Sequence, residues 1–287
     1  MDILVSSNLE RLLLEIEEEI VFRGIPKQFC NKNNIIYKAM MKCFEKSNYS
    51  VKGLKIEIIK QDIPISRGLG SSSSCIVAGL MGANYIMGNI LAKEEILILA
   101  VEIEGHPDNV APAIFGGMIV AILDDTLPIY DKVNIKAGIK FVAIIPDFKL
   151  STEVARKVLP EEISLSKGIY NIGRESLMVS SLVNGNYKLL KYACKDAIHQ
   201  EYRSSLINNY HEVYEKSFEI GAFGCFLSGA GPTIVAIIDN RNNDFSYKME
   251  KYLYEIKAYW DVKYLKIDND GATILEGDIN EGELFSN

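Results

Sequence analysis

Apolar positions along the chain recur with two periods, one typical of helices and one typical of strands. Apolar residues three or four positions apart predict helices over residues 34–46, 72–87, 93–104, 152–158, 169–182, 187–197, 206–220 and 247–256. Alternating or β-branched runs predict strands over residues 54–59, 118–123, 140–145, 223–227, 233–238, 262–267 and 272–275. The runs 118–123 and 140–145 are bounded by turn residues, and we expect both to be core strands. In the second half of the chain, this pattern indicates an α+β arrangement.

The pattern changes after Pro146, where predicted helices take over from predicted strands. The chain has 287 residues, which suggests two domains at about 150 residues each. We therefore expect a boundary near residue 148, with domains 1–148 and 149–287.

Composition and charge exclude several classes of protein. Hydrophobic residues make up 48% of the chain and charged residues 24%, as in globular proteins. A net charge of -7 has the wrong sign for nucleic-acid or anionic-membrane partners, so an anionic ligand must be bound locally. The five scattered cysteines form no C-x-x-C pair and indicate neither a disulfide framework nor a zinc site. This cysteine usage fits a reducing cytoplasm, where we expect the protein. With no uncharged apolar run of about 18 residues, we expect no membrane span.

A glycine-containing loop runs directly into the predicted helix at residue 72. Gly68 and Gly70 allow close backbone approach, and the first N–H groups of a helix attract anions, so the loop predicts a phosphate site. Arg67 adds a full positive charge. The alternative is a serine-capped helix after a flexible turn. The predicted ligands are Pro64, Ile65, Ser66, Arg67, Gly68, Leu69, Gly70, Ser71, Ser72, Ser73 and Ser74.

Two further stretches carry polar groups or glycines at expected turns. In the first, Glu104 can hold Mg²⁺ against a nucleotide, while Asp108 and Asn109 can bond a substrate hydroxyl. The alternative for Asp108 and Asn109 is helix capping. The second is the glycine-rich stretch 226–233 between two predicted strands, whose alternative is a tight hairpin turn.

These three stretches, in this order, resemble the GHMP small-molecule kinases. The stretch 104–112, Glu-Gly-His-Pro-Asp-Asn-Val-Ala-Pro, with Gly116-Gly117 after it, is most similar to the homoserine kinase branch. The resemblance implies a two-domain α+β fold with its active site in the inter-domain cleft, and ATP-dependent phosphorylation of L-homoserine in threonine biosynthesis. It implies ATP and Mg²⁺ as cofactors, with Ser72 and Glu104 as metal ligands and Asp108 and Asn109 in the catalytic motif. The identity of a proton acceptor stays open.

The resemblance extends to substrate-binding positions in the second half. Thr152 and Arg156 match homoserine-binding positions, and Tyr202-Arg203 matches a second substrate-binding arginine. Thr152 and Arg156 are four residues apart, hence on one helix face. Two guanidinium groups suit the carboxylate of an amino acid.

The N-terminus departs from the family pattern. The first family motif is Pro-x-x-x-Asn-x-Gly-x-Gly-Phe-Asp, and Asp2 matches its final residue, which would face the substrate ammonium. We expect either a start further upstream or a diverged copy with impaired activity. Two functional alternatives stay open, a GHMP kinase for another small alcohol and a non-catalytic nucleotide-binding homologue. A homodimer is also compatible with the sequence.

Overall fold

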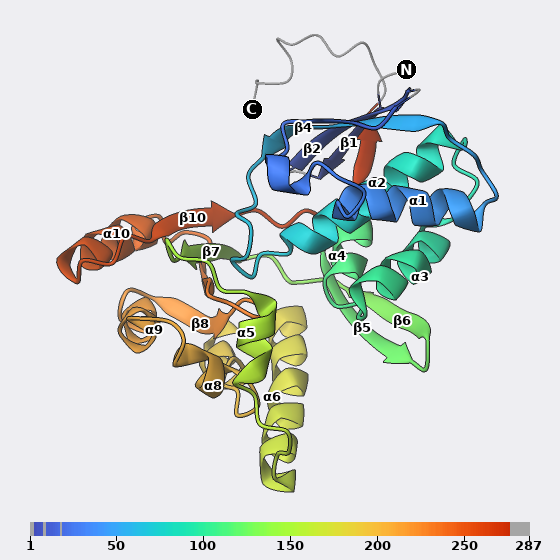
Figure 1. Ribbon diagram of the computed structural model, residues 1–287. Helices are drawn as coiled ribbons and strands as arrows, with labels where there is room; N and C mark the ends of the chain where they lie inside the picture. The colour runs from blue at the N-terminus through green and yellow to red at the C-terminus, as the bar shows by residue number, and fades with distance from the viewer. Residues whose placement is uncertain (1–2, 8–9, 18, 276–287) are drawn as a thin grey trace. The chain divides into compact units, whose positions relative to one another are not determined.

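The computed structural model describes residues 3–7, 10–17 and 19–275 (Figure 1). The chain forms two compact units, the first from Met1–Ile63, Gly70–Lys132 and Asp268–Asn287, the second from Pro64–Leu69 and Val133–Ile267. The sequence predicted one boundary near residue 148. The units divide the chain differently because β7 (Ile139–Ile145) pairs with strands of the second unit, whereas β11 (Thr273–Leu275) returns to pair in the first.

The first unit contains a five-stranded sheet in the order β11-β1-β2-β4-β3. β1 (Ile3–Ser7), β2 (Glu10–Glu17) and β4 (Gly53–Gln61) pair antiparallel, and β3 (Val21–Arg23) pairs parallel with β4. The predicted strands at 54–59 and 272–275 are confirmed. β1, β2 and β3 were not predicted, because two of them are short and charged residues interrupt the third.

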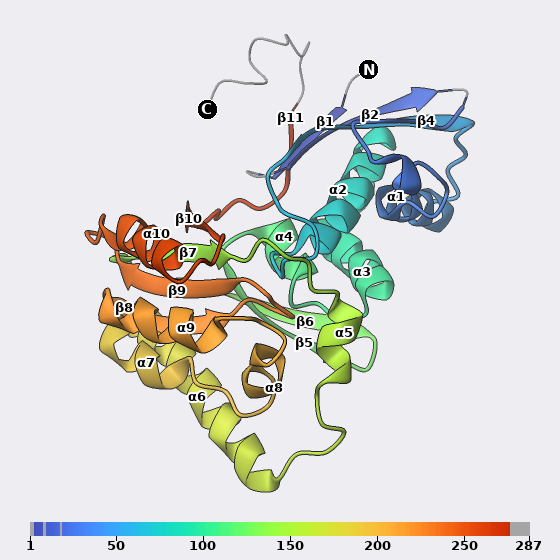
Figure 2. The ribbon, with the colours of Figure 1, turned by 60° about the vertical axis from the view of Figure 1, so that its left-hand side comes forward.

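Helices cover one side of this sheet (Figures 1 and 2). They are α1 (Ile35–Lys46), α2 (Ser71–Ile86), α3 (Lys93–Glu104) and α4 (Val110–Phe115), with a short 3-10 helix, η1 (Lys27–Phe29), before them. α2 packs against β1 and β2 and also against the other three α-helices. It is therefore buried on several sides, as its small and apolar residues predicted.

β5 (Met118–Asp124) and β6 (Leu127–Val133) form a separate two-stranded sheet. The prediction that 118–123 is a core strand was wrong, because Val120 and Ile122 are exposed. Only the other face of β5, with Ile119 and Ala121, packs against the core of the first unit. A β-branched run thus marked a strand that is buried on one side.

The second unit is built on an antiparallel sheet in the order β10-β7-β9-β8. β8 (Ala222–Leu227), β9 (Ile234–Asp239) and β10 (Asp261–Leu265) join β7, whose residues from Val142 onward are buried. The core-strand prediction for 140–145 is confirmed for Val142–Ile145, whereas Lys140 and Phe141 are only partly buried.

Helices α7, α9 and α10 pack against the edge strands of this sheet. The helices are α5 (Thr152–Lys157), α6 (Leu165–Asn184), α7 (Leu190–Ala193), α8 (Gln200–Ser204), α9 (Tyr210–Glu219) and α10 (Phe245–Glu255), with η2 (Tyr187–Leu189) before α7. The predicted helix 187–197 is reduced to η2 and α7. α9 begins late because Asn209, at φ 62°, breaks the helical path. Among the described residues, no helix has both the length and the apolarity to cross a membrane.

A close backbone contact holds the loop Pro64–Leu69 within the second unit. Gly68 has φ +76°, and a Cβ added there would lie 2.3 Å from the carbonyl oxygen of Ser228. The Ser228 hydroxyl donates a hydrogen bond to the Gly68 carbonyl over 2.7 Å. The Thr233 N–H donates to the Arg67 carbonyl over 3.3 Å. Glycine at position 68 is therefore required by both conformation and space.

Gly68→Ala should destabilise the protein by more than ~2 kcal/mol, because left-handed strain adds to a backbone clash. Gly70→Ala is the matched control: Gly70 has φ +79°, but nothing lies within 4 Å of an added Cβ. Gly70→Ala should therefore lower the stability only by the roughly 1 to 2 kcal/mol that the left-handed conformation costs a residue with a Cβ. Urea unfolding of both variants measures the difference, and equal losses would contradict the contact.

Candidate active site

Arg67 ties the glycine loop to the chain that follows β7. Its Nε donates to the Pro146 carbonyl over 2.9 Å, and its Nη2 donates to the Asp147 carbonyl over 2.8 Å. Burial lowers the pKa of Arg67, although Asp147 opposes this shift. Nη1 is buried and has no hydrogen-bond partner in the described part of the chain. Arg67 thus holds the loop, and its contact with ATP phosphates stays a prediction.

The start of α2 provides the second part of the predicted phosphate loop. Gly70 precedes the helix in the left-handed conformation, and its carbonyl accepts from the Ser74 N–H over 3.0 Å. The N–H groups of the first helical turn have no partners within a helix. Together with the helix dipole and the open space beside Gly70, they suit an anion.

Two hydroxyls of this first turn meet a carboxylate at the end of α3. The Ser73 hydroxyl donates to Oε1 of Glu104 over 2.9 Å, and the Ser72 hydroxyl donates to Oε2 over 3.3 Å. Ser72 and Glu104, the predicted metal ligands, are therefore adjacent. Ser73 is 2% exposed, so its hydroxyl holds Glu104 in place.

The surroundings of Glu104 fit a magnesium ion. Within the described ranges, Glu104 forms no ion pair with a lysine or arginine. It also lies at the negative end of the α3 dipole, which disfavours a carboxylate there. Among the described residues, no group of three or more His, Cys, Asp and Glu side chains is placed so that it could hold a metal ion. Mg²⁺ commonly uses one or two carboxylates plus substrate phosphates, so one carboxylate with hydroxyls is an adequate donor set.

The predicted catalytic pair lies in the turn between α3 and α4. The Asp108 carboxylate, 67% exposed, contacts Nδ1 of His106. Asn109 occupies the position before α4, but its side chain makes no capping hydrogen bond. The capping alternative is therefore wrong for Asn109.

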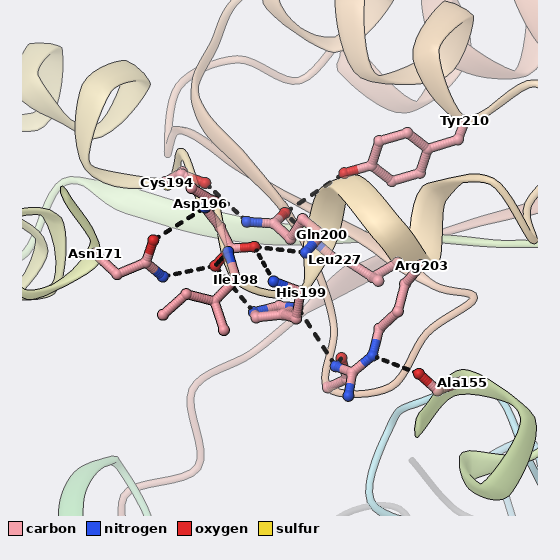
Figure 3. Close-up of polar contacts among 12 residues, drawn as sticks. Ala155, Asn171, Cys194, Asp196, Ile198, His199, Gln200, Arg203, Tyr210 and Leu227 are labelled. Atoms are coloured by element: carbon pink, nitrogen blue, oxygen red, sulfur yellow. Dashed lines mark hydrogen bonds and ion pairs between the residues drawn. The ribbon is translucent and has the colours of Figure 1, made fainter. Parts of the chain in front are cut away.

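The second unit brings the two predicted substrate arginines together. Arg203, on α8, donates from Nε to the Ala155 carbonyl over 3.1 Å and from Nη1 to the Gly229 carbonyl over 3.0 Å (Figure 3). Burial, and then the positive charge of neighbouring Arg156, lower the pKa of Arg203. Arg156 is exposed on α5, the helix that Thr152 begins. Asp2 lies outside the described residues.

A network around Asp196 was not predicted from the sequence. The Asp196 carboxylate accepts hydrogen bonds from the N–H groups of Ile198, His199 and Gln200 and from the side-chain amide of Asn171. Figure 3 shows this carboxylate between α6 and the start of α8. The available signal was an aspartate shortly before a helix, a common cap residue. Because residues 187–197 were predicted to form one helix, Asp196 was expected inside that helix and not before the start of α8.

Comparisons with known proteins agree with this geometry. The sequence matches the GHMP kinases N terminal domain over residues 34–117 and the GHMP kinases C terminal domain over residues 178–254. Homoserine kinases from Clostridium beijerinckii and Clostridium botulinum are 59% and 56% identical to it, each over 92% of this chain and 88% or 89% of theirs.

A crystal structure of homoserine kinase from Cytophaga hutchinsonii matches with a TM-score of 0.84 at 26% identity. The match covers 95% of this chain and 91% of that one. The chain therefore belongs to the GHMP kinase family and, within it, to the homoserine kinases.

Proposed function

We propose that this chain transfers the terminal phosphoryl group of ATP to the hydroxyl of L-homoserine, giving O-phospho-L-homoserine on the route to threonine. The observation that carries the proposal is the arginine pair Arg156 and Arg203. Burial, and then the positive charge of Arg156, lower the pKa of Arg203, so the two guanidinium groups repel each other. A carboxylate bound between them relieves this repulsion and accepts their hydrogen bonds. The names of the close relatives support homoserine as the substrate.

On the nucleotide side, we assign the ATP phosphates to residues 64–74. The open space at Gly70 and the N–H groups that begin α2 would bind phosphate oxygens. Ser72 and Glu104 would hold Mg²⁺, which when bound neutralises charge on the phosphates. Ser73 keeps the Glu104 carboxylate oriented. Phosphoryl transfer depends mainly on positioning and charge neutralisation, which these groups supply.

On the substrate side, Arg156 and Arg203 would bind the homoserine carboxylate, with Thr152 on the same helix as Arg156. We assign Asp2 to the substrate ammonium. Asp108 and Asn109 would orient the reacting hydroxyl, and the contact with His106 restrains the Asp108 carboxylate. A fixed hydroxyl geometry lowers the entropic part of the barrier.

The function is tested by incubating the full chain with ATP, Mg²⁺ and one candidate alcohol at a time. We expect phosphate-ester formation, followed by ³¹P NMR, with L-homoserine and at least ~10-fold less with mevalonate or galactose, which lack an amino-acid head group. Turnover of another alcohol instead would favour a different GHMP specificity. Nucleotide binding without any turnover would support the non-catalytic alternative.

Glu104→Gln keeps the shape and one acceptor of the side chain but removes its charge. We expect kcat to fall on the order of 100-fold, because a charge that holds the metal against the phosphates is lost. The midpoint of thermal unfolding should change little. Glu102→Gln, on the same helix and paired with Lys42 over 2.8 Å, is the control and should keep its kcat. Wild-type activity of the Glu104 variant over a range of Mg²⁺ would refute the assignment.

Arg203→Ala should raise the KM for homoserine at least ~10-fold, because losing one partner of a desolvated charge pair costs roughly 2 to 5 kcal/mol. Arg203→Lys keeps the charge but not the planar guanidinium group, so its KM for homoserine should lie between those of the wild type and of Arg203→Ala. Arg241→Ala removes an arginine that is 86% exposed and should leave the KM unchanged. A change below about threefold for Arg203→Ala would place the carboxylate site elsewhere.

A further inference from the structure

The second unit contains a carboxylate that the proposed reaction does not use. The Asp196 side chain is 6% exposed. Its Oδ1 accepts from the Asn171 amide over 2.6 Å and from the Ile198 N–H over 3.1 Å. Its Oδ2 accepts from the N–H groups of His199, over 2.7 Å, and Gln200. Burial alone would raise the pKa of Asp196, but these hydrogen bonds outweigh it and hold the pKa below its usual value. The buried group is therefore a carboxylate anion at neutral pH.

This anion organises a helix that is too short to hold its own position. α8 spans only Gln200–Ser204, and a helix of this length is not stable by itself. Asp196 satisfies N–H groups at its start, and Gln200 links it to the sheet. The Gln200 Oε1 accepts from the Leu227 N–H over 2.8 Å, and Nε2 donates to the Cys194 carbonyl over 3.0 Å. The placement of α8 thus depends on these polar contacts.

Arg203 lies on this helix, and a second path connects it to Asp196 through His199. Nδ1 of His199 is 3.4 Å from Nη1 of Arg203, and its Nε2 is 3.8 Å from Oδ1 of Asp196 (Figure 3). Burial and the positive charge of Arg203 lower the pKa of His199, although Asp196 opposes the shift. A neutral imidazole with its proton on Nε2, toward the carboxylate, can accept from Arg203 through Nδ1.

We propose that Asp196 is a positioning residue for substrate capture, because it fixes the guanidinium of Arg203 through the first turn of α8 and through His199. The role rests on the proposed function, in which Arg203 binds the homoserine carboxylate. Asp196 itself touches neither substrate nor nucleotide in this assignment. Its negative charge also offsets part of the repulsion between Arg203 and Arg156, since it favours the charged form of Arg203.

Asp196→Asn tests this role, because an amide of the same shape cannot accept from all four donors. We expect the KM for homoserine to rise about 10-fold, with kcat within threefold and the KM for ATP within twofold of wild type. The decisive measurement is a double-mutant cycle with Arg203→Ala. If Asp196 acts through Arg203, Asp196→Asn should change the homoserine KM less than twofold once Arg203 is absent.

Asp239→Asn is the matched control, because Asp239 also accepts from a backbone N–H and an arginine side chain, both of Arg241. It should lower the unfolding midpoint without changing the homoserine KM. If Asp196→Asn does not fold, Asn171→Ala removes one donor to the carboxylate and should raise that KM about threefold.

Two results would overturn the positioning role while leaving the function intact. One is a KM increase that is equally large with and without Arg203, and the other is a KM no higher than in the Asp239 variant. A wild-type chain that does not phosphorylate homoserine would instead overturn the proposed function itself.

Discussion

The arrangement of the second unit depends on the absence of a side chain at Gly68. The Ser228 carbonyl oxygen lies where a Cβ would stand, so the loop Pro64–Leu69 and the turn after β8 can approach only with glycine at this position. The contact joins residues 160 positions apart in the sequence. The chain then continues through Gly70 into α2, whose first turn holds the candidate phosphate and metal groups. A single close backbone approach thus determines the course of the loop Pro64–Leu69.

Two hydrogen-bonded carboxylates, one in each unit, differ in what they can bind. Asp196 is buried, and its four donors come from one short turn and Asn171, so its oxygens are committed to the protein. Glu104 is half-buried and, within the part of the chain that the structure describes, accepts hydrogen bonds from two serine hydroxyls, which themselves can serve as oxygen ligands. A metal ion would have to replace two hydrogen bonds from serine hydroxyls at Glu104, but four hydrogen bonds at Asp196. Hydrogen-bond satisfaction therefore separates a structural anion from a candidate metal ligand more clearly than residue type does.

The sequence predicted the elements with strong local signals and missed those that depend on distant partners. α1, α2 and α3 were placed nearly to the residue because Asn34 caps α1 and glycines flank α2 and α3. β2 and β3 were missed because their own sequences lack a clear strand pattern. Their extended conformation is stabilised by pairing with β4. The resemblance to the GHMP kinases indicated Glu104, Arg156 and Arg203 as candidate site residues. No sequence motif indicated Asp196. Most of its hydrogen-bond donors are backbone N–H groups, which almost every residue type has, so the sequence does not reveal them.

The turn after β8 is more than the hairpin connection that its glycines suggested. It does connect two antiparallel strands, β8 and β9. Yet Ser228 bonds the carbonyl of Gly68, and the next residue, Gly229, offers its own carbonyl to Arg203. Since the two residues are consecutive, the same short turn contacts both the loop Pro64–Leu69 and Arg203. A displacement of this turn would disturb both partners together, which is a stronger constraint on its sequence than the formation of a hairpin alone.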